Sequence, residues 1–547
     1  MQASDFDTEL SPLGGLYSET ISSILAARAD ERGGTVALQF MGRTLTYREL
    51  LDAATAFAHA VEAIPGGQPG DRVCVLLENG LQFVIAFFGT VLAGRIFVPL
   101  NVAYQAPQLE FVLGDVEPAV FVTETNYLPL VSDVVSRSAA APFLVLVDNG
   151  PDSPRSAGSI DFGAFLNTGA HGPATFRPRP STPMMILYTS GTTGQSKGII
   201  YRHRATIWFA GIACYALELS DADILHTCLP LFHANALLCT VVAGTIVGAT
   251  TVISPRFSVS GFWREVAESN ATVTSMLGSM PTLLWRAEPH PDETAHRLRL
   301  AYVAPLPDGI VAEFQERFRL ALATTYGLTD ASILTVGRAG PDMLSGSCGR
   351  QFPDWELKLV DDDDEPVPPG AIGEMIARSR LPHIGGSGYW RNGEATAEAW
   401  SNLWHHSGDL LAQDETGAYH YRERKKDSIR KAGENVSSFE VELAITAVPG
   451  VDQAAVFAVP SDLGDDEIMA VIVPREGTIL DLASLREQCR AVLPYFAVPR
   501  FWETADTLPL TETSRVRKSE LRGRGVTAST WDSGPVRRGA VTRGTSR

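Results

Sequence analysis

The sequence is poor in cysteine and in positive charge. Its 547 residues include only six cysteines, and no two of them form a Cys-x-x-Cys pair. Their spacing fits neither a zinc site nor a disulfide framework, so we expect free, buried thiols in a cytoplasmic protein. The 63 acidic residues outnumber the 45 lysines and arginines, which gives a net charge of −18. A general nucleic-acid-binding protein usually has a basic surface, so we expect no nucleic-acid partner.

Membrane-spanning and secretory segments are also missing from the sequence. Residues 1–5 lack the basic and then apolar pattern of a signal peptide. The most apolar stretch, 237–253, is shorter than a comfortable membrane span. It is interrupted by small or polar residues, namely Thr240, Gly244, Thr245 and Gly248. We therefore expect a buried helix and strand in this stretch, and no membrane span.

The distribution of apolar runs predicts an α/β fold. Short apolar runs alternate with helical stretches and predict parallel sheets with helices on both faces; they lie at 72–77, 96–100, 119–122, 143–147, 252–253 and 273–276. After about Gly408 the pattern changes to short strands with one or two helices, which predicts a small α+β domain. We expect a large N-terminal domain of several subdomains at 1–423, the small domain at 424–525 and a disordered tail at 526–547.

The strongest chemical signal is a loop rich in glycine and hydroxyl groups at 186–198. An apolar strand leads into this loop, which closes with Lys197. Glycines let backbone N–H groups approach an anion closely, hydroxyls add neutral donors, and the lysine adds a positive charge. The loop therefore predicts a polyphosphate site. Its binding residues are Thr189, Ser190, Gly191, Thr192, Thr193, Gly194 and Lys197.

The loop matches neither of two common nucleotide-binding motifs. A Walker A loop places glycine directly before the lysine, but Ser196 occupies that position. No Gly-x-Gly-x-x-Gly follows a strand. The loop instead resembles the signature loop of the adenylate-forming superfamily, which includes acyl-CoA synthetases, peptide-synthetase adenylation domains and luciferases. Ser196 replaces the usual proline, which changes the stiffness of the loop but removes no phosphate donor.

Further segments resemble motifs of the same superfamily in the same order, over roughly 18–522. The segment Pro-Leu-Phe-His-Ala-Asn at 230–235 resembles the motif whose histidine, here His233, borders the acyl pocket. The segment Thr-Tyr-Gly-Leu-Thr-Asp at 325–330 resembles the motif that contacts AMP and magnesium. The resemblance implies that Tyr326 stacks on adenine beside Gly327, and that Thr329 contacts the phosphate.

Two of these matches depart from the superfamily pattern. Asp330 stands where the family has a glutamate that holds magnesium. Aspartate is still a hard oxygen ligand, but it is one methylene shorter, so its coordination can run through water. Ala304 ends a segment that resembles the adenine-contacting Gly-Gly-Ala-Pro motif, but Tyr302 and Val303 replace the two glycines.

The C-terminal part carries further matches. His-Ser-Gly-Asp-Leu at 406–410 resembles the motif whose aspartate, here Asp409, accepts both ribose hydroxyls. A carboxylate accepts two hydrogen bonds, which suits a vicinal diol. Arg424 resembles the second ribose or phosphate contact, and Lys426 falls on the position of the hinge about which the small domain rotates. Gly433 resembles a glycine that lines the tunnel for the thiol, while Ala432 replaces its usual neighbour.

The lysine that assists adenylation in the superfamily is replaced here. It falls on Arg515, and the glycine before it falls on Ser514. Arginine keeps the positive charge but presents a planar fork instead of a compact ammonium. The resemblance gives the role of neutralising the reacting oxygens to Arg515, and Lys518 is a less favoured substitute.

Taken together, the motifs imply an AMP-forming acid–thiol ligase. Its substrates are a small carboxylic acid, ATP with Mg²⁺, and coenzyme A, and its products are an acyl-CoA, AMP and pyrophosphate. The segments at 433–442 and 493–500 most resemble the carnitine/crotonobetaine-CoA ligase-like branch. We expect no fused carrier domain, because only about 25 residues follow Leu521. The sequence predicts neither the acid nor the oligomeric state.

Other functions stay open at this point. An adenylating enzyme can load a separate carrier protein, form an amide, or activate nitrite for diazotisation, and the altered Ser514-Arg515 pair is compatible with these. A different class of protein, one that binds nucleotide without catalysis, is disfavoured by the nearly complete series of motifs.

Overall fold

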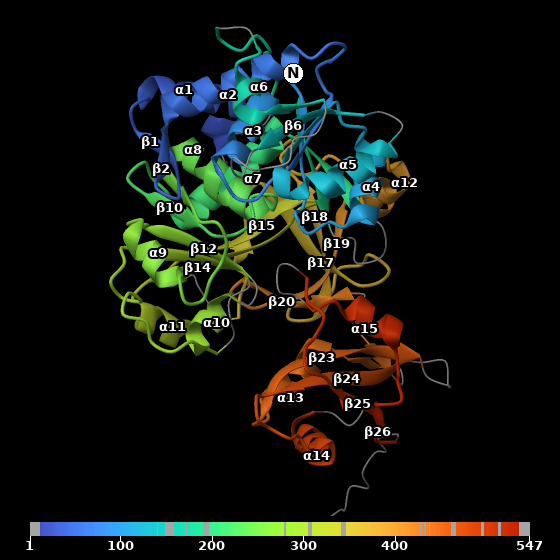
Figure 1. Ribbon diagram of the computed structural model, residues 1–547. Helices are drawn as coiled ribbons and strands as arrows, with labels where there is room; N and C mark the ends of the chain where they lie inside the picture. Colours follow the sequence, from blue (N-terminus) through green and yellow to red (C-terminus); the bar gives the residue numbers. More distant parts are fainter. Residues whose placement is uncertain are drawn as a thin grey trace, which may run out of the picture. The chain divides into compact units, whose positions relative to one another are not determined.

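The computed structural model divides into two compact units (Figure 1). We describe each unit by itself. Unit 1 comprises Met1–Leu357 and Ala377–His405, and unit 2 comprises Lys358–Ile376 and His406–Arg547. The residues that the structure describes are 11–138, 141–147, 158–169, 172–189, 196–277, 280–304, 309–340, 346–425, 429–431, 434–436, 438–460, 466–493, 497–511 and 516–534. The domain boundary at residue 424 and the rotation about a hinge stay predictions.

A seven-stranded sheet in unit 1 has the order β7-β6-β5-β3-β4-β8-β9. Its strands are β3 (Arg72–Leu76), β4 (Ile96–Pro99), β5 (Val120–Glu124), β6 (Phe143–Val147), β7 (Ser159–Asp161), β8 (Pro183–Thr189) and β9 (Lys197–Arg202). Neighbouring strands are parallel except for β8 and β9, which form an antiparallel hairpin. The last four residues of β3 are all buried, as expected of a parallel strand covered on both faces.

A nine-stranded sheet in unit 1 has the order β16-β15-β14-β13-β12-β10-β11-β1-β2. Its strands are β1 (Val36–Phe40), β2 (Arg43–Thr46), β10 (Ile224–Thr227), β11 (Thr250–Ile253), β12 (Val273–Leu277), β13 (Leu300–Ala304), β14 (Ala321–Leu328), β15 (Ser332–Gly337) and β16 (Arg350–Gln351). The strands from β14 across to β1 are parallel, and β2, β15 and β16 are antiparallel to their neighbours.

Helices connect and cover these strands. They are α1 (Ile21–Glu31), α2 (Tyr47–Glu62), α3 (Leu81–Leu92), α4 (Ala106–Val116), α5 (Leu128–Ser136), α6 (Phe162–Leu166), α7 (His203–Leu217), α8 (Ala243–Val247), α9 (Phe262–Glu268), α10 (Met280–Arg286), α11 (Val311–Phe318) and α12 (Gly393–Ala399). Because β10, β12, β13 and β14 are parallel, the segments that follow them leave the sheet at one edge. Open α/β sheets bind their ligands at this carboxyl edge.

The apolar stretch 237–253 forms the expected helix and strand, and the expectation of buried cysteines holds for four of the six. The stretch 237–253 forms most of a π-helix (Asn235–Val242), then α8 and β11. Within the described residues, no helix is both long and apolar enough to cross a membrane. All six cysteines are free thiols, and four of them are buried.

Unit 2 contains the predicted small α+β fold. Strands β23 (Val451–Pro460), β24 (Asp466–Pro474), β25 (Phe501–Thr504) and β26 (Trp531–Asp532) form one sheet. Apolar residues of α13 (Ser438–Thr446) and α14 (Leu482–Val492) pack on one face, and Leu521 of α15 (Lys518–Arg524) packs on the other. Strands β19 (His405–Gln413) and β20 (Tyr419–Arg424) form an antiparallel pair. With the parallel-rich sheets of unit 1, this confirms the predicted fold class.

The first part of the segment predicted to be a disordered tail is ordered instead. Trp531–Asp532 pair with β25, and Trp531 packs against the core beneath α13 and α14. Asp532 accepts two hydrogen bonds from Arg500, at 2.9 Å from Nε and 2.8 Å from Nη2. The Gly, Ser and Thr content of the segment predicted disorder. Composition alone could not reveal that Arg500, a distant residue in the sequence, would hold Asp532. Residues 535–547 lie outside the described residues.

Two histidines in the core of unit 1 are held in their neutral form. His203, at the start of α7, accepts a hydrogen bond from the backbone N–H of Ile21 at 3.1 Å. His226 on β10 lies between the hydroxyls of Thr274 and Ser254, at 2.9 and 3.0 Å. Burial lowers the pKa of His203 to about 3 and that of His226 to about 4, because it disfavours the charged imidazolium.

These lowered pKa values predict that the protein loses stability in mild acid. Below the unfolded-state pKa of about 6.5, these histidines are protonated in the unfolded chain but stay neutral in the folded chain. Unfolding is therefore favoured as the pH falls. Between pH 7.5 and 5.5, each histidine should lower the free energy of unfolding by about 1 kcal/mol. Urea denaturation at the two pH values checks this, with pH 8.5 against 7.5 as the control. Equal stability at pH 7.5 and 5.5 would contradict it.

Candidate active site

The hairpin of β8 and β9 carries the glycine- and hydroxyl-rich loop. β8 ends at Thr189, β9 begins at Lys197, and these two residues are paired across the hairpin. Because β8 is parallel to β4, the loop leaves the sheet at its carboxyl edge. The predicted residues Ser190, Gly191, Thr192, Thr193 and Gly194 lie outside the described residues. The structure therefore fixes the two ends of the loop.

Lys197 and Asp330 both contact Tyr389. The Nζ atom of Lys197 lies 4.9 Å from the centroid of the Tyr389 ring, and the Tyr389 hydroxyl donates a hydrogen bond to Oδ2 of Asp330. No ion pair joins Lys197 directly to Asp330 within the described part of the chain. Two residues predicted from separate motifs are thus brought together by a tyrosine that the sequence did not single out.

The backbone around this cluster is closely packed. The hydroxyl of Tyr201 on β9 donates to the carbonyl of Thr329 at 2.6 Å. The segment before Tyr389 pairs with β9 through Ser387 and Ile200 at 2.9 Å. A Cβ atom on Gly386 would lie 2.1 Å from the Asp330 carbonyl oxygen, so only glycine fits there. This run of glycines beside an aromatic pair, 385–390, is the signal that could have identified Tyr389.

The two tyrosine hydroxyls act as donors over the whole physiological pH range. Burial raises the pKa of Tyr389, and the nearby Asp330 charge raises it further. Burial also raises the pKa of Tyr201 well above its usual value. Both hydroxyls therefore stay protonated, which suits hydrogen bonds to Asp330 and to the Thr329 carbonyl.

The predicted adenine contacts lie on adjacent strands. β13 ends at Ala304, and β14 beside it carries Tyr326 and Gly327. Gly327 is required, because a Cβ atom there would lie 2.5 Å from the Ser332 carbonyl oxygen. Tyr302, which replaces a family glycine, is buried, and its hydroxyl lies 2.6 Å from that of Thr325 on β14. The structure thus places Ala304, Tyr326 and Gly327 near the same sheet edge as Asp330.

His233 lies in the segment between β10 and the π-helix. Its Nε2 atom is buried and has no hydrogen-bond partner among the described residues. Burial lowers the pKa of His233 to about 4, so the imidazole is neutral at pH 7. The ring lies 4.6 Å from that of Phe232.

Asn79 fixes the start of the segment that carries His233. Its side-chain amide donates to the carbonyls of Leu229 and Ser254, at 2.9 and 3.0 Å, and its Oδ1 accepts from the N–H of Leu231 at 2.8 Å. The side chain is nine-tenths buried. Asn79 lies just before α3, so one amide joins the seven-stranded sheet to the segment after β10.

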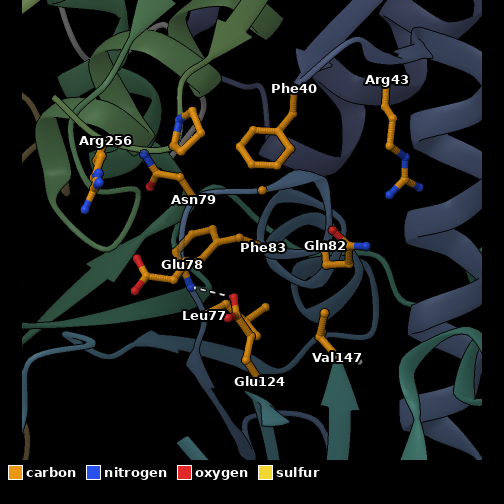
Figure 2. Close-up of a pocket in the computed structure, with 12 residues that line it drawn as sticks. Phe40, Arg43, Leu77, Glu78, Asn79, Gln82, Phe83, Glu124, Val147 and Arg256 are labelled. Carbon is orange, nitrogen blue, oxygen red and sulfur yellow. Dashed lines mark hydrogen bonds between the residues drawn. The ribbon is translucent and has the colours of Figure 1, made fainter. Parts of the chain in front are cut away.

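Asn79 also lines a cavity of about 490 Å³, which Figure 2 shows. The cavity lies at the carboxyl ends of β1, β3, β5, β6 and β11. It is lined by Phe40, Arg43, Leu77, Glu78, Asn79, Gly80, Gln82, Phe83, Glu124, Val147, Pro255 and Arg256. None of the site residues predicted from the sequence is among these lining residues, so the cavity does not represent the predicted nucleotide site.

In unit 2, the structure brings Asp409 and Arg424 together. The two residues are paired across β19 and β20, and Nε of Arg424 lies 2.7 Å from Oδ1 of Asp409. The Asp409 side chain is only 4% exposed, whereas that of Arg424 is 34% exposed. Gly408 has φ of +66° and donates its N–H to Glu374 at 3.0 Å, which sets the backbone before Asp409.

The remaining predicted residues of unit 2 are only partly accounted for. Lys426, Gly433 and Arg515 lie outside the described residues. Lys518 is held by Glu442 at 2.8 Å and by the Ser438 hydroxyl at 2.7 Å. Its ammonium is therefore engaged within unit 2, which fits its place as the less favoured substitute for the family lysine.

Comparison with protein families gives matches over most of the chain. The model described as "AMP-binding enzyme" matches residues 25–390, and the one described as "AMP-binding enzyme C-terminal domain" matches residues 440–515. The chain is 30% identical over 520 residues to a feruloyl-CoA synthase of Amycolatopsis sp, covering 93% of this chain and 100% of that protein. It is 29% identical over 492 residues to a crotonobetaine/carnitine–CoA ligase of Proteus mirabilis, covering 88% and 93%.

Solved structures show the same fold. An anthranilate CoA ligase in complex with anthranoyl-AMP has a TM-score of 0.84 at 24% identity, and the alignment covers 96% of this chain and 99% of that one. ATP-bound MatB from Rhodopseudomonas palustris has a TM-score of 0.82 at 25% identity, with coverage of 92% and 99%.

The contacts of Asn79 predict a large structural cost for its loss. In Asn79→Ala, the carbonyls of Leu229 and Ser254 and the N–H of Leu231 lose their buried partner, so the free energy of unfolding should fall by about 3 kcal/mol. Urea denaturation measures this. Gln82→Ala is the matched control, because Gln82 lines the same cavity and should change stability by less than about 0.5 kcal/mol. Equal effects of the two variants would refute the anchoring role.

Proposed function

Because the chain belongs to the AMP-binding enzyme family, we propose that it activates a carboxylic acid with ATP and transfers the acyl group to coenzyme A. The predicted membership of the adenylate-forming acyl-CoA ligases and the predicted acid–thiol ligase activity are confirmed by its relatives, which are named CoA ligases and synthases. The observation that carries the proposal for the site is the cluster of Lys197, Tyr389 and Asp330 at the base of the predicted phosphate loop.

The first step forms an acyl adenylate. An oxygen of the acid attacks the α-phosphorus of ATP, the bond between the α-phosphorus and the bridging oxygen breaks, and pyrophosphate leaves. Position and charge neutralisation supply most of the catalysis in such a transfer. We assign the β- and γ-phosphates to the loop from Thr189 to Lys197, with Thr192 among its donors, and the charge at the reacting oxygens to Arg515.

The donor set near Asp330 fits magnesium. Tyr389 occupies Oδ2 of Asp330, which leaves Oδ1 for a cation. The described residues contain no cluster of three or more His, Cys, Asp or Glu side chains that could hold a metal alone. Mg²⁺ usually binds through one or two carboxylates, water and the phosphates of the substrate, so a single aspartate suffices. When bound, the metal supplies positive charge to the departing pyrophosphate.

We assign further nucleotide contacts within each unit, taken separately. Tyr326 offers an aromatic face for adenine, next to Gly327 and Ala304, and the backbone around Thr329 is fixed by Tyr201. In unit 2, the Asp409 carboxylate is oriented by Arg424, as an acceptor of the ribose hydroxyls needs to be.

The second step transfers the acyl group to a thiol. The thiolate of coenzyme A attacks the carbonyl carbon of the adenylate, the C–S bond forms, and AMP leaves as its bond to that carbon breaks. A neutral His233 next to the acid suits this step because it adds no charge to the acyl pocket. We also propose that Gly433 lines the tunnel for the thiol and that the small domain rotates about a hinge at Lys426.

A screen of pyrophosphate release tests the proposed function. Each of a set of carboxylic acids, as well as nitrite, is incubated with MgATP in the presence and absence of coenzyme A. The products are identified by mass spectrometry. We expect acid-dependent pyrophosphate release and an acyl-CoA only when coenzyme A is present. Release of pyrophosphate without any thioester would point to another acceptor, and no release with any acid would refute the proposal.

Tyr389→Phe tests the arrangement around Asp330. The variant removes a hydrogen bond to a charged carboxylate, an interaction of about 1.5 kcal/mol or more, so the Mg²⁺ concentration for half-maximal pyrophosphate release should rise about tenfold. Binding of Mn²⁺ to the complex with ATP, followed by electron paramagnetic resonance, gives a second readout. Tyr215→Phe is the control, because this tyrosine is 36% exposed and lies on α7. An unchanged metal requirement in Tyr389→Phe would remove Tyr389 from the site.

A further inference from the structure

A buried carboxylate in unit 2 connects two neighbouring segments through separate oxygen atoms. Glu374 lies on β18 (Ile372–Ser379), which is next to β19 in its sheet, and only 5% of the residue is exposed. Its Oε1 atom accepts a hydrogen bond from the N–H of Gly408 on β19 at 3.0 Å. Its Oε2 atom accepts one from Nζ of Lys425 at 2.8 Å, directly after the end of β20. One side chain therefore connects β19 with the end of β20.

Both contacts lie one residue away from the predicted ribose contacts. Gly408 precedes Asp409, and Lys425 follows Arg424. Asp409 and Arg424 are paired across β19 and β20, with Nε of Arg424 2.7 Å from Oδ1 of Asp409. A shift of Gly408 relative to Lys425 would be passed on to this pair through the backbone. Glu374 therefore restrains the pair without being part of it.

The backbone that Glu374 contacts has an unusual conformation. Gly408 has φ of +66°, in the left-handed region that favours glycine, so the chain turns just before Asp409. The N–H of Asp409 donates to Oγ of Ser407 at 3.1 Å, and Asp409 is buried. A carboxylate that accepts two ribose hydroxyls must be held to within about 0.5 Å of the productive position. The hydrogen bond from Gly408 to Glu374 therefore bears directly on nucleotide binding.

The charge of Glu374 strengthens this contact. A hydrogen bond to an ionised carboxylate is roughly twice as strong as one to a neutral acceptor. Lys425 supplies the opposite charge and also lies 3.1 Å from Asp362, and Nδ1 of His406 lies 3.6 Å from Oε1 of Glu374. Backbone hydrogen bonds already join β18 to β19, so the side chain of Glu374 is not needed to pair the strands.

We propose that Glu374 is a positioning residue for nucleotide binding, which holds the Asp409 carboxylate where it accepts both ribose hydroxyls. Glu374 acts through Gly408 and Lys425 and does not itself contact the nucleotide. The consequence is a preference for a nucleotide with both hydroxyls over one that lacks them. This inference rests on the proposed function, because it requires Asp409 to bind the ribose.

ATP and 2′,3′-dideoxy-ATP are the two probes that test the inference. Their kcat and KM are measured in pyrophosphate release with Mg²⁺, coenzyme A and the most active acid of the screen. The hydroxyl preference is the ratio of kcat/KM for ATP to that for dideoxy-ATP. In Glu374→Ala this ratio should fall about tenfold, mainly through a higher KM for ATP, because a misplaced carboxylate gains little from the hydroxyls. The kcat/KM for dideoxy-ATP should change less than about threefold, because its sugar lacks both hydroxyls.

Glu374→Gln is a second variant that perturbs the structure less. It keeps the shape of the side chain and an oxygen that accepts from the N–H of Gly408, but it loses the charge that pairs with Lys425. Its hydroxyl preference should fall about threefold, which lies between the original protein and Glu374→Ala. This variant keeps the test valid if the alanine variant does not fold.

Glu503→Ala is the matched control for the loss of a buried carboxylate. Glu503 on β25 is also 5% exposed, pairs with Arg524 at 3.0 Å and accepts a hydrogen bond from Thr530 at 2.7 Å. Its removal should lower the Tm, as that of Glu374 does, but should leave the hydroxyl preference unchanged. An equal loss of the preference in both alanine variants would reflect general destabilisation and would overturn the inference.

The remaining outcomes separate the inference from the proposed function. If the original protein prefers ATP and both Glu374 variants keep that preference, the inference is overturned and the proposed function stands. If the original protein uses ATP and dideoxy-ATP equally well, the ribose contact assigned to Asp409 is wrong and the inference falls with it. If no acid releases pyrophosphate, the proposed function as a whole is refuted, and the inference with it.

Discussion

The hydrogen bond from Tyr389 to Asp330 joins two segments of unit 1 that are far apart in the sequence. Lys197 lies against the ring of the same tyrosine, which adds a third segment to this cluster. A direct ion pair between Lys197 and Asp330 would largely neutralise both charges before any nucleotide bound. Within the described residues the two groups form no ion pair, so in the proposed function the ammonium is available for phosphate and one carboxylate oxygen for a metal. The raised pKa of Tyr389 keeps its hydroxyl protonated as a donor to Asp330.

The polar groups at the edge of the nine-stranded sheet fall into two classes. Asn79 and His226 use their hydrogen-bonding atoms on the protein itself, which fixes the segments that surround the site. Among the described residues, His233 and Asn235 each have one buried polar atom without a partner. The satisfied groups resist rearrangement, so the unsatisfied ones cannot easily turn to find partners.

The sequence predicted those features that depend on local pattern. Continuous apolar runs such as 72–76 identified buried parallel strands, and the glycine- and hydroxyl-rich run before Lys197 identified the loop between β8 and β9. Features that depend on distant partners were missed. Tyr389 is 59 positions from Asp330, and Asp532 is ordered by Arg500, 32 positions away. The π-helix was missed because a short and mostly apolar run shows no clear period from which its geometry could be read.

The contacts of Lys518 give a physical reason why it does not take the place of the family lysine, which falls on Arg515. The ammonium of Lys518 pairs with Glu442 and is also held by Ser438, whose N–H and hydroxyl bind the buried carboxylate of Glu423 on β20. If the Lys518 side chain moved to another site, Glu442 and Ser438 would lose this contact. The cost in free energy would be larger than for a flexible, exposed lysine, which has no such contacts to break. In the proposed function, the positive charge for the adenylation step is therefore assigned to a different residue. Arginine remains charged at any physiological pH, and its fork can contact two oxygens at once, so Arg515 suits a site where a carboxylate and a phosphate must be brought together.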